Sequence, residues 1–570
     1  MGHTCRIFRS WVLYLSCLIA IPVGLYSRAC VGQGKWQFTE VAEQVGLLPA
    51  AGGLRGHGAA WGDFNQDGWL DLYVATFATG GGETNRLFFN RDGRFEWQPQ
   101  PAVQVATRAT GVVAADLDND GDLDLYVASM PAPPGSRLAE REGRPLRGCC
   151  LFRNDGGGRF TDVSEGNGAC PEAFGGRSVA VLDFDGDGLL DLFVGEDPHP
   201  GYNGSSTRRS RLFRNRGDLA FEDVTAAAGL PDQLPGLGVA AGDVNNDGWP
   251  DLFAASSDGG NRLFLNDGRG RFIEASWLNR VFEWPDARGD NMVCGVALAD
   301  VNRDGWLDLV LGQHYDHPWR VPVPNRLYLN RTHTQQRVSF EDVTEAAGLE
   351  PLAMKAPHVE IQDFDNDGWP EIYQSVVKFA EGKCYPILFR HTGLVDGLPR
   401  FSNDAWQVNS FPDASYQNLS SRDLFDRLVK EKIIFYSAPG PVADWNRDGK
   451  LDIFLASWWP ELPPLLLKNE TPGGNWLQVS LEGSGSINRM GIGSRILVYR
   501  AGGADNPSEL LGCREIAVGY GYASGQPAAA HFGLGTEQQV DLVVVLPHGR
   551  GRVVRRGVAA GQHIVIRTAP

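Results

Sequence analysis

The sequence predicts an all-β fold: a seven-bladed β-propeller, whose last blade is closed by an N-terminal strand, followed by a small C-terminal β-sandwich. Three observations predict it. An acidic nine-residue pattern, D-x-[ND]-x-D-G-x-x-[DE], occurs seven times. The copies start 53, 67, 60, 57, 63 and 81 residues apart, a spacing that suits one four-stranded blade with its loops. Long amphipathic helical patterns are nearly absent from the 570 residues.

The N-terminal segment has the features of a secretory signal. Arg6 and Arg9 precede an apolar run over residues 11–26, and Ser27 and Ala29 stand at positions −3 and −1 of a cleavage site. We expect a signal peptide over residues 1–29 and a secreted chain that is extracellular, periplasmic or at the cell surface. No other segment approaches 18 uncharged apolar residues, so no transmembrane segment is expected in the mature chain.

The first copy of the acidic pattern, "DFNQDGWLDLYVA" from Asp63, is typical of a calcium loop that leads into a strand. Ca²⁺ takes six to eight oxygen ligands, and alternate residues of a tight turn direct their oxygens inward. Positions 1, 3, 5 and 9 supply side-chain oxygens, position 7 supplies a carbonyl, and the glycine at position 6 permits the turn. The residues after position 9 are β-prone.

The seven copies, called loops 1 to 7, occupy residues 63–71, 116–124, 183–191, 243–251, 300–308, 363–371 and 444–452. Up to seven Ca²⁺ ions are therefore expected. The predicted ligands are Asp63, Asn65, Asp67, Trp69, Asp71; Asp116, Asp118, Asp120, Asp122, Asp124; Asp183, Asp185, Asp187, Leu189, Asp191; Asp243, Asn245, Asp247, Trp249, Asp251; Asp300, Asn302, Asp304, Trp306, Asp308; Asp363, Asp365, Asp367, Trp369, Glu371; and Asp444, Asn446, Asp448, Lys450, Asp452.

A second pattern between the loops completes each blade. Segments such as "RLFRNRGDLAFEDV" from Arg211 predict a third strand that ends in Asn, a turn, and a short fourth strand that begins with Phe. After loop 7 the third strand "PPLLLKN" from Pro463 has no such partner. The missing strand, "FTEV" from Phe38, stands before loop 1, so we expect it to pair with Leu465–Lys468 and close the ring.

The repeats resemble the FG-GAP or VCBS repeats of integrin α-subunit propellers. Segments from about residue 475, including "NWLQVSLEG", "REIAVGYGYASGQ" and "HFGLG", resemble the ASPIC/UnbV C-terminal domain. Together they are similar to the cartilage acidic protein family. This resemblance implies a propeller over residues 30–472 and an ASPIC/UnbV-like β domain over residues 473–570. Met490 departs from the family pattern, which has Asp there, and Glu371 replaces Asp in loop 6.

The formal net charge of −17 excludes a nucleic-acid-binding surface. Loss of residues 1–29 removes three arginines and no acidic residue, and seven Ca²⁺ ions would add fourteen positive charges, which leaves about −6. Most of the acidity is thus explained by metal ligands. We interpret the ions chiefly as structural, because each would neutralise carboxylates that otherwise repel one another in a tight turn.

Outside the loops, the sequence predicts one helix and leaves the cysteines open. The apolar stripe of Ser420–Lys432 predicts a packing helix between blades six and seven. Cys170 is placed to bridge Cys149 or Cys150, whereas a buried free thiol explains Cys294 equally well. Glycosylation sequons occur at Asn203, Asn330, Asn418 and Asn469.

Ligand binding is expected at the end of the propeller opposite the acidic loops, where the connecting segments differ between blades. Mixed charge beside aromatic residues suits an extracellular protein or glycan. The candidate residues are Arg55, His57, Arg108, Arg177, Asp197, His199, Asp290, His314, Asp316, His317, His358, Trp458 and Trp459. An alternative for any one of them is a structural role, with Trp459 packed on the C-terminal domain. The alternative function is a hydrolase or lyase that uses the His and Asp residues of the same segments.

Overall fold

The computed structural model describes residues 36–77, 83–196, 209–284, 293–315, 317–333, 337–519 and 521–568. The predicted signal peptide and four candidate ligand residues, Asp197, His199, Asp290 and Asp316, lie outside these ranges, as does Asn203. Within them, no helix is long and apolar enough to cross a membrane. The all-β prediction is confirmed, since strands dominate and the α-helices are confined to α1 (Arg137–Glu142), α2 (Asn279–Phe282), α3 (Thr344–Ala347) and α4 (Ser421–Glu431).

In the described residues, each acidic loop joins the first and second strands of a four-stranded antiparallel group. First strands are β2 (Gly56–Gly62), β6 (Ala109–Ala115), β10 (Ser178–Leu182), β14 (Gly238–Gly242), β18 (Val293–Ala299), β22 (Val359–Gln362) and β27 (Val442–Ala443). Second strands are β3 (Asp71–Thr76), β7 (Asp124–Ser129), β11 (Asp191–Gly195), β15 (Asp251–Ala255), β19 (Asp308–Gln313), β23 (Glu371–Ala380) and β28 (Asp452–Leu455).

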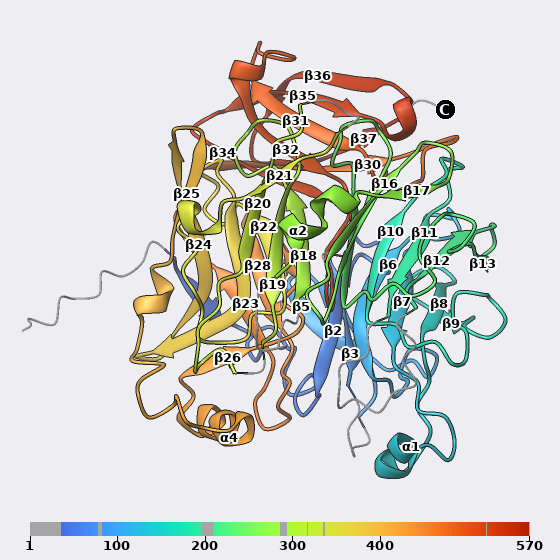
Figure 1. Cartoon of the computed structure of the whole chain (residues 1–570), viewed down its shortest axis with the longest axis vertical. Coiled ribbons are helices and arrows are strands. Elements are labelled where there is room, and N and C mark those ends of the chain that lie inside the picture. The colour runs from blue at the N-terminus through green and yellow to red at the C-terminus, as the bar shows by residue number, and fades with distance from the viewer. Residues whose placement is uncertain are drawn as a thin grey trace, which may run out of the picture.

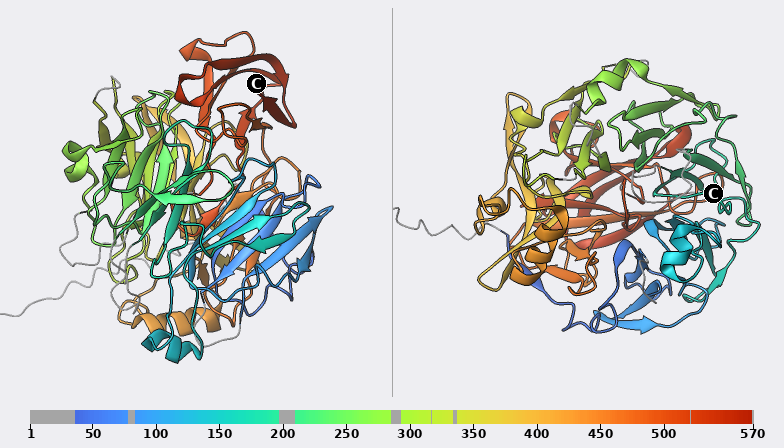
Figure 2. Two further views of the ribbon diagram at one scale, coloured as in Figure 1. Left: turned by 90° about the vertical axis from the view of Figure 1, so that its right-hand side faces the viewer. Right: turned by 60° about the horizontal axis from the view of Figure 1, so that its bottom comes forward.

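The outer strands follow the second sequence pattern. Third strands are β4 (Arg86–Arg91), β8 (Cys150–Asn154), β12 (Arg211–Asn215), β16 (Arg262–Asn266), β20 (Arg326–Asn330), β24 (Lys383–Val395) and β29 (Leu465–Asn469). Fourth strands are β5 (Arg94–Gln98), β9 (Phe160–Asp162), β13 (Phe221–Asp223), β17 (Phe272–Glu274), β21 (Phe340–Asp342), β25 (Leu398–Ser402) and β1 (Phe38–Glu40). The groups stand around a common axis, in chain order (Figure 2).

The predicted closure by the N-terminal strand is confirmed. β1 pairs antiparallel with β29, with Thr39 opposite Lys468 and Glu40 opposite Leu467. Phe38 also pairs with Cys384 of β24, which joins the sixth and seventh groups into one nine-stranded sheet. The number of seven separate blades therefore stays a prediction. The arrangement of the sheets as a propeller of FG-GAP type is supported. Pairing strands so distant in sequence leaves no exposed edge at the point of closure.

The C-terminal strands form two sheets that pack face to face. One sheet has the order β34 (Ala530–Gly535), β30 (Asn475–Glu482), β37 (Gln562–Arg567). The other has the order β32 (Leu510–Glu515), β31 (Arg495–Arg500), β35 (Gln539–Val545), β36 (Arg552–Ala559). This C-terminal domain lies on the acidic-loop end of the propeller, and α1 and α4 lie at the opposite end (Figure 1). The predicted boundary between residues 472 and 473 stays a prediction.

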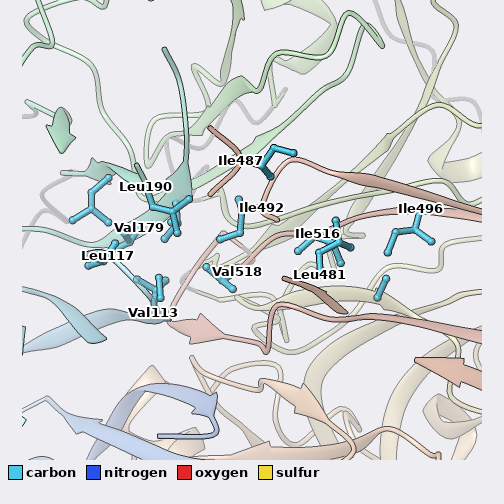
Figure 3. Packing of buried hydrophobic residues seen from close by; sticks show 14 of the residues in the cluster. Val113, Leu117, Val179, Leu190, Leu481, Ile487, Ile492, Ile496, Ile516 and Val518 are labelled. Atoms are coloured by element: carbon cyan, nitrogen blue, oxygen red, sulfur yellow. The ribbon is translucent and has the colours of Figure 1, made fainter. Parts of the chain in front are cut away.

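The two parts share a hydrophobic core. Val113, Leu117, Val179 and Leu190 of the second and third blades belong to the same buried cluster as Ile492 of the C-terminal domain (Figure 3). Residues from both C-terminal sheets, Val479 and Leu542 among them, extend the cluster. Because burial of apolar area contributes about 25 cal/mol per Å², a continuous core of this kind makes the domain an integral part of the fold.

The predicted helix near Ser420 is confirmed as α4. Its Ser420 N-cap accepts a hydrogen bond from the backbone N–H of Asp423, and Leu424 and Leu428 are buried. The aromatic ring of Phe425 packs on Trp459 at 5.4 Å between ring centres, and Tyr436 of β26 (Ile434–Tyr436) contacts Trp459 at 5.2 Å. Trp459 therefore packs against α4 and β26, and not against the C-terminal domain as the alternative structural role supposed.

Candidate metal sites on the acidic-loop face

Loop 1 shows how the acidic residues converge. The Asp63 carboxylate accepts hydrogen bonds from the N–H groups of Asp67 (3.1 Å) and Gly68 (2.8 Å). The Asn65 Oδ1 also accepts from the Asp67 N–H, at 2.9 Å. Gly68 has φ +85°, a left-handed conformation that favours glycine. The turn thus directs the oxygens of positions 1, 3 and 5 toward its own centre.

Position 9 is the most deeply buried ligand position. Asp71 is fully buried, and its two carboxylate oxygens accept hydrogen bonds from the N–H of Asn90 (2.7 Å) and of Phe64 (3.1 Å). Glu371, the longer side chain in loop 6, accepts from the corresponding groups of His391 (3.4 Å) and Phe364 (3.0 Å). Position 9 therefore ties its loop to the third strand of the same blade.

Groups of carboxylates come close enough to hold one ion. In loops 2, 3 and 6 the ligand atoms of three acidic residues lie within 4.8 Å of one another. They are Asp116, Asp118 and Asp120; Asp183, Asp185 and Asp191; and Asp363, Asp365 and Glu371. In the other four loops position 3 is Asn, whose amide oxygen is also a ligand for hard cations.

Burial makes these carboxylates costly to ionise. Burial, together with the smaller effect of neighbouring carboxylates, raises the pKa of Asp71 and of Asp124 to about 8. Burial likewise raises the pKa of Asp300 and Asp444 to about 7. A divalent cation can replace the protons that such a cluster otherwise holds. The donor set of oxygens without nitrogen or sulfur fits a hard cation.

Two hydrogen-bonded chains of side chains connect neighbouring blades. In the first, the position 4 side chain donates to the position 6 carbonyl of the next loop. The donor and acceptor pairs are Gln66 to Gly121 (2.9 Å), Asn119 to Gly188 (2.9 Å), Asn246 to Gly305 (3.3 Å), Arg303 to Gly368, Asn366 to Gly449 (2.9 Å) and Arg447 to Gly68. Six of the seven acidic loops are thereby held to the next loop around the ring.

Loop 3 lacks this side chain, because its position 4 is Gly186. The carbonyl of Gly248 that it would otherwise reach accepts a hydrogen bond from the backbone N–H of His548, at 2.7 Å. A Cβ on Gly186 would lie 3.0 Å from the Trp249 ring and 3.4 Å from the His548 ring. The C-terminal domain therefore supplies the one connection that the propeller does not make itself, and glycine leaves the room for it.

The second chain uses the Asn that ends each third strand. Its amide donates to the position 2 carbonyl of the preceding loop, as Asn215 does to Leu117 at 2.6 Å. In the sixth blade His391 takes this place and lies 3.2 Å from the carbonyl oxygen of Val301. In the other blades the Asn amide donates to the same kind of backbone carbonyl. These donor and acceptor pairs are Asn90 to Trp445, Asn154 to Phe64, Asn266 to Phe184, Asn330 to Val244 and Asn469 to Phe364.

These hydrogen bonds show that two of the four sequons cannot be glycosylated in the folded chain. Asn330 and Asn469 are buried and their amides are engaged, so neither can carry a glycan in the folded chain, whereas Asn418 is exposed. Cys149, Cys150 and Cys170 form no disulfide, so the bridge from Cys170 to Cys149 or Cys150 is absent.

The C-terminal domain places basic side chains over the acidic loops. Arg495 donates to the Gly305 carbonyl (3.0 Å) and to the Asn246 side chain, and lies 4.0 Å from Asp243. The three loops with four carboxylates at the ligand positions, loops 2, 3 and 6, are also faced by such groups. Arg489 lies 3.7 Å from Asp116, His548 lies 3.7 Å from Asp183, and Arg514 opposes the upward pKa shift that burial causes at Asp363.

A glycine-rich segment of the same domain enters the propeller axis. We call it the axial loop, residues 517–529, of which 520 lies outside the described ranges. Val239 of β14 donates its N–H to the Gly521 carbonyl (3.0 Å), and Ala59 of β2 donates to Ala523 (3.1 Å). The short strand β33 (Ser524–Gly525) pairs with β2. A Cβ on Gly521 would lie 2.1 Å from the Val296 nitrogen, so only glycine fits there.

The axial loop contacts two predicted ligand residues, His57 and Arg177, and a third, Arg108, is buried nearby. Tyr522 accepts a hydrogen bond from Arg177 at 3.1 Å and packs on His57 at 5.7 Å between ring centres. Arg108 lies over the Phe77 ring at 4.2 Å. The exposed fractions of His57, Arg108 and Arg177 are 8 %, 2 % and 3 %. The structure thus gathers three predicted residues around the axis, but it contradicts their placement on an exposed face.

The remaining predicted ligand residues have different surroundings. His358 is fully buried and lies 3.0 Å from Glu360, so it is not part of an exposed face either. His317 lies 3.3 Å from the Ser421 hydroxyl at the start of α4, and His314 is half-buried. Arg55 and Trp458 are half-buried and contact each other at 5.6 Å. Among the predicted ligand residues that the structure describes, only these two keep the expected combination of a cation and an accessible aromatic ring.

The comparisons with known proteins match the two patterns. The model of the FG-GAP-like repeat matches residues 63–127, 148–194, 202–254 and 243–311, and the model "ASPIC and UnbV" matches residues 483–570. Human cartilage acidic protein 1 is 29 % identical over 470 residues, which are 80 % of this chain and 62 % of the relative. The mouse protein of the same name is 27 % identical over 529 residues, 88 % of this chain and 72 % of the relative.

The chain thus spans about six tenths of the human relative's length. Solved structures are less similar. A complex of BBS1N with ARL6DN has a TM-score of 0.36 and 11 % identity, with 73 % of this chain and 92 % of that chain covered. The V. cholerae biofilm matrix protein Bap1 has a TM-score of 0.28 and 13 % identity, with 89 % of this chain and 67 % of that chain covered. Scores this low establish no shared function.

The repeated acidic loops, the strand groups that they join and the domain docked on them agree with these matches. The chain carries FG-GAP-like repeats and an ASPIC and UnbV domain, and it is similar to cartilage acidic protein 1 over most of its own length.

Proposed function

We propose that this chain is a secreted, calcium-stabilised binding module for an extracellular protein or glycan. The observation that carries the proposal is the sevenfold repetition of one oxygen-lined turn on a ring of sheets whose connecting segments differ. A repeated site in equivalent surroundings is what a structural ion requires, whereas a catalytic site is normally built once from unlike residues.

Calcium is the cation proposed for the loops. Their donors are carboxylates, amide oxygens and backbone carbonyls, which suit Ca²⁺, and extracellular modules bind it at about 10⁻⁴–10⁻³ M. At about 1 mM calcium each site would stabilise the fold by about 0.4–1.4 kcal/mol. Each ion would fix the conformation of its loop. The two chains of hydrogen bonds would connect each stabilised loop to the neighbouring blades.

Two of the histidines that a hydrolase or lyase would use are enclosed, whereas His314 and His317 are half-buried. His57 and His358 are buried, and burial lowers the pKa of His57 well below its ordinary value, further lowered by Arg177. A group so enclosed has no path to a substrate. The binding module is therefore the function that the geometry favours.

A binding screen tests the proposal. The full mature chain would be tested against panels of extracellular proteins and of glycans, once in calcium and once in excess chelator. The expected result is binding to at least one class that is lost or weakened at least tenfold without calcium. Absence of binding to either panel in calcium would contradict a binding module.

A further inference from the structure

A cleft of about 900 Å³ separates part of the acidic-loop face from the C-terminal domain. Its floor consists of residues from loops 7, 1 and 2, including Asp444, Asp63 and Asp116. Its roof is the sheet face formed by β30 and β37, and the segment 527–529 closes one side. Ligand sites are commonly about 300–1,000 Å³ and lie preferentially between domains, so the size and place of this cleft suit a small ligand.

Loop 1 is set apart from the other loops at this cleft. Asp63 is half-buried, whereas the position 1 carboxylates of loops 2 to 7 are all buried. In the ranges that the structure describes, no hydrogen bond or ion pair joins loop 1 to residues 473–570. The C-terminal domain instead bonds loops 2 to 6 directly and packs Trp476 over Gly449 of loop 7. The domain therefore rests on six loops and stands clear of one.

The roof offers alternating polar side chains. Gln478, Ser480 and Glu482 follow one another on the same face of β30, because side chains two residues apart share a face. Across the parallel pair, Gln478 is opposite His563 and Ser480 is opposite Val565. The Ser480 hydroxyl and the His563 Nε2 lie 2.7 Å apart. The roof thus presents an amide, a hydroxyl, an imidazole and a carboxylate within two strands.

Two arginines from opposite directions complete the polar lining. Arg447 extends from loop 7 to the Gly68 carbonyl and lies over the Trp69 ring at 4.6 Å. Arg489 has a 44 % exposed side chain, and its contacts with Asp116 and Glu482 are long, at 3.7 and 4.0 Å. Its guanidinium is therefore available to a ligand that offers oxygen atoms.

Apolar surface lies among these polar groups. Leu70, Leu123, Met490 and Ala528 line the cleft, and Val565 is 52 % exposed. A lipid would leave the polar roof unsatisfied. An anionic ligand would be repelled even in calcium, because loops 7, 1 and 2 hold eleven acidic residues, more than three bound Ca²⁺ ions would neutralise, and Glu482 adds another carboxylate against the two arginines. A neutral molecule with many hydroxyl groups and apolar C–H faces satisfies both kinds of surface.

We propose that this cleft binds a neutral saccharide of a few sugar units, held by Gln478, Ser480, His563 and the two arginines. The proposal rests on the binding-module function above and assigns to it a site and a ligand class. It places ligand binding on the loop face, where the docked domain leaves loop 1 uncovered, and away from the axial residues that the axial loop buries.

The test uses two exposed valines of the same domain. Val565→Trp fills the cleft, whereas Val545→Trp is the matched control, because Val545 is 36 % exposed on β35 and does not line the cleft. Both variants of the full mature chain would be compared with the parent for binding to immobilised neutral oligosaccharides in calcium. Uronate-containing oligosaccharides and acidic peptides form the other arms, and melting temperatures report folding.

The expected result is binding of the parent and of Val545→Trp to a neutral oligosaccharide, with at least tenfold weaker binding by Val565→Trp at an unchanged melting temperature. A second variant, Ser480→Ala, is expected to weaken the same binding without filling the cleft. Equal binding by Val565→Trp, or a preference for the uronate or peptide arms, would overturn the proposal. If the chain binds an extracellular protein but no neutral saccharide, this inference fails while the binding-module function stands.

Discussion

At the scale of single residues, an Asn near the end of the third strand joins two neighbouring blades in six of the seven strand groups. Asn215 is buried and donates to Leu117 of the second blade at 2.6 Å and to Leu190 of its own blade at 3.0 Å. Its backbone N–H donates to Asp191 at 2.7 Å. One residue thus contacts two acidic loops, and the loss of its amide leaves two buried carbonyls without their partner.

Substitution of this residue tests the connection between blades. Asn215→Ala is expected to lower the free energy of unfolding by about 1–3 kcal/mol, the cost of buried acceptors left unpaired. Asn418→Ala, at an exposed position, is expected to change it by less than about 0.5 kcal/mol. Thermal unfolding of the two variants in calcium measures both values. Equal melting temperatures for the two variants would show that the Asn215 hydrogen bonds between the blades contribute nothing to the stability of the fold.

The acidic loops also predict an unusual pH dependence without calcium. Burial raises the pKa of Asp71 to about 8 and that of Asp300 to about 7, whereas an aspartate in an unfolded chain titrates near about 3.9. In the measured range, from about pH 6.5 to 8, these carboxyl groups therefore still hold protons in the folded state that they have already lost in the unfolded state. The stability of the folded state falls as the pH rises through this range. Buried histidines act only at lower pH.

The measurement is the melting temperature of chelator-treated, desalted protein between about pH 6.5 and 8. It is expected to fall as the pH rises, and added calcium is expected to remove most of the fall, because the ion takes the place of the protons. A calcium-free melting temperature that rises across this range would contradict the raised pKa values.

At the scale of elements, the axial loop depends on glycine where it passes the inner strands. Gly521 has φ +64°, and a Cβ there would lie 2.1 Å from the Val296 nitrogen. Gly502 has a similar φ of +82°, but a Cβ there would meet nothing within 4 Å. The two positions share the backbone conformation that alanine disfavours and differ in the surrounding space.

Alanine at these two glycines separates the two effects. Gly502→Ala is expected to cost about 1 kcal/mol, from backbone strain alone. Gly521→Ala is expected to displace the axial loop and expose the core shared by the two domains, which lowers the melting temperature much further and increases cleavage by added protease. Similar melting temperatures and protease sensitivity for both variants would mean that the axial loop is not required for docking.

The sequence predicts these elements unevenly. Repetition makes the loops and strands predictable, because seven copies of one pattern average out local exceptions, and the pairing of Phe38–Glu40 with β29 follows from counting strands. The docking of the C-terminal domain is not predictable this way, since it depends on single contacts such as the bond from His548 to Gly248. The glycines of the axial loop were visible, but their spacing alone does not reveal which surface they approach.

The predicted ligand face fails for a physical reason. The argument from strand direction places His57, Arg108 and Arg177 at the correct end of their strands, but it treats the propeller axis as open. Tyr522 of the axial loop enters that space and contacts His57 and Arg177. The position 4 side chains were missed for another reason: Gln, Asn and Arg share no obvious property until their bonds to the next loop are seen.

At the scale of the whole molecule, the propeller and the C-terminal domain form one stabilised body. The acidic loops lie between them, so their charge affects both the ring and the docked domain. Seven ions bound to the loops would lower the repulsion within each turn, and the links between loops would transmit the effect to the neighbouring blades. Calcium removal is therefore expected to destabilise the chain as a whole and not one blade at a time.

The most direct test of the account is a count of bound calcium together with a melting curve of the full mature chain. Elemental analysis after dialysis against about 1 mM calcium is expected to find several ions, up to seven per chain, because most loops would be occupied at that concentration. Excess EGTA is expected to lower the melting temperature by many degrees in a single transition. A chain that retains no calcium, or a melting curve unchanged by EGTA, would contradict the central claim that the repeated loops stabilise this fold through bound calcium.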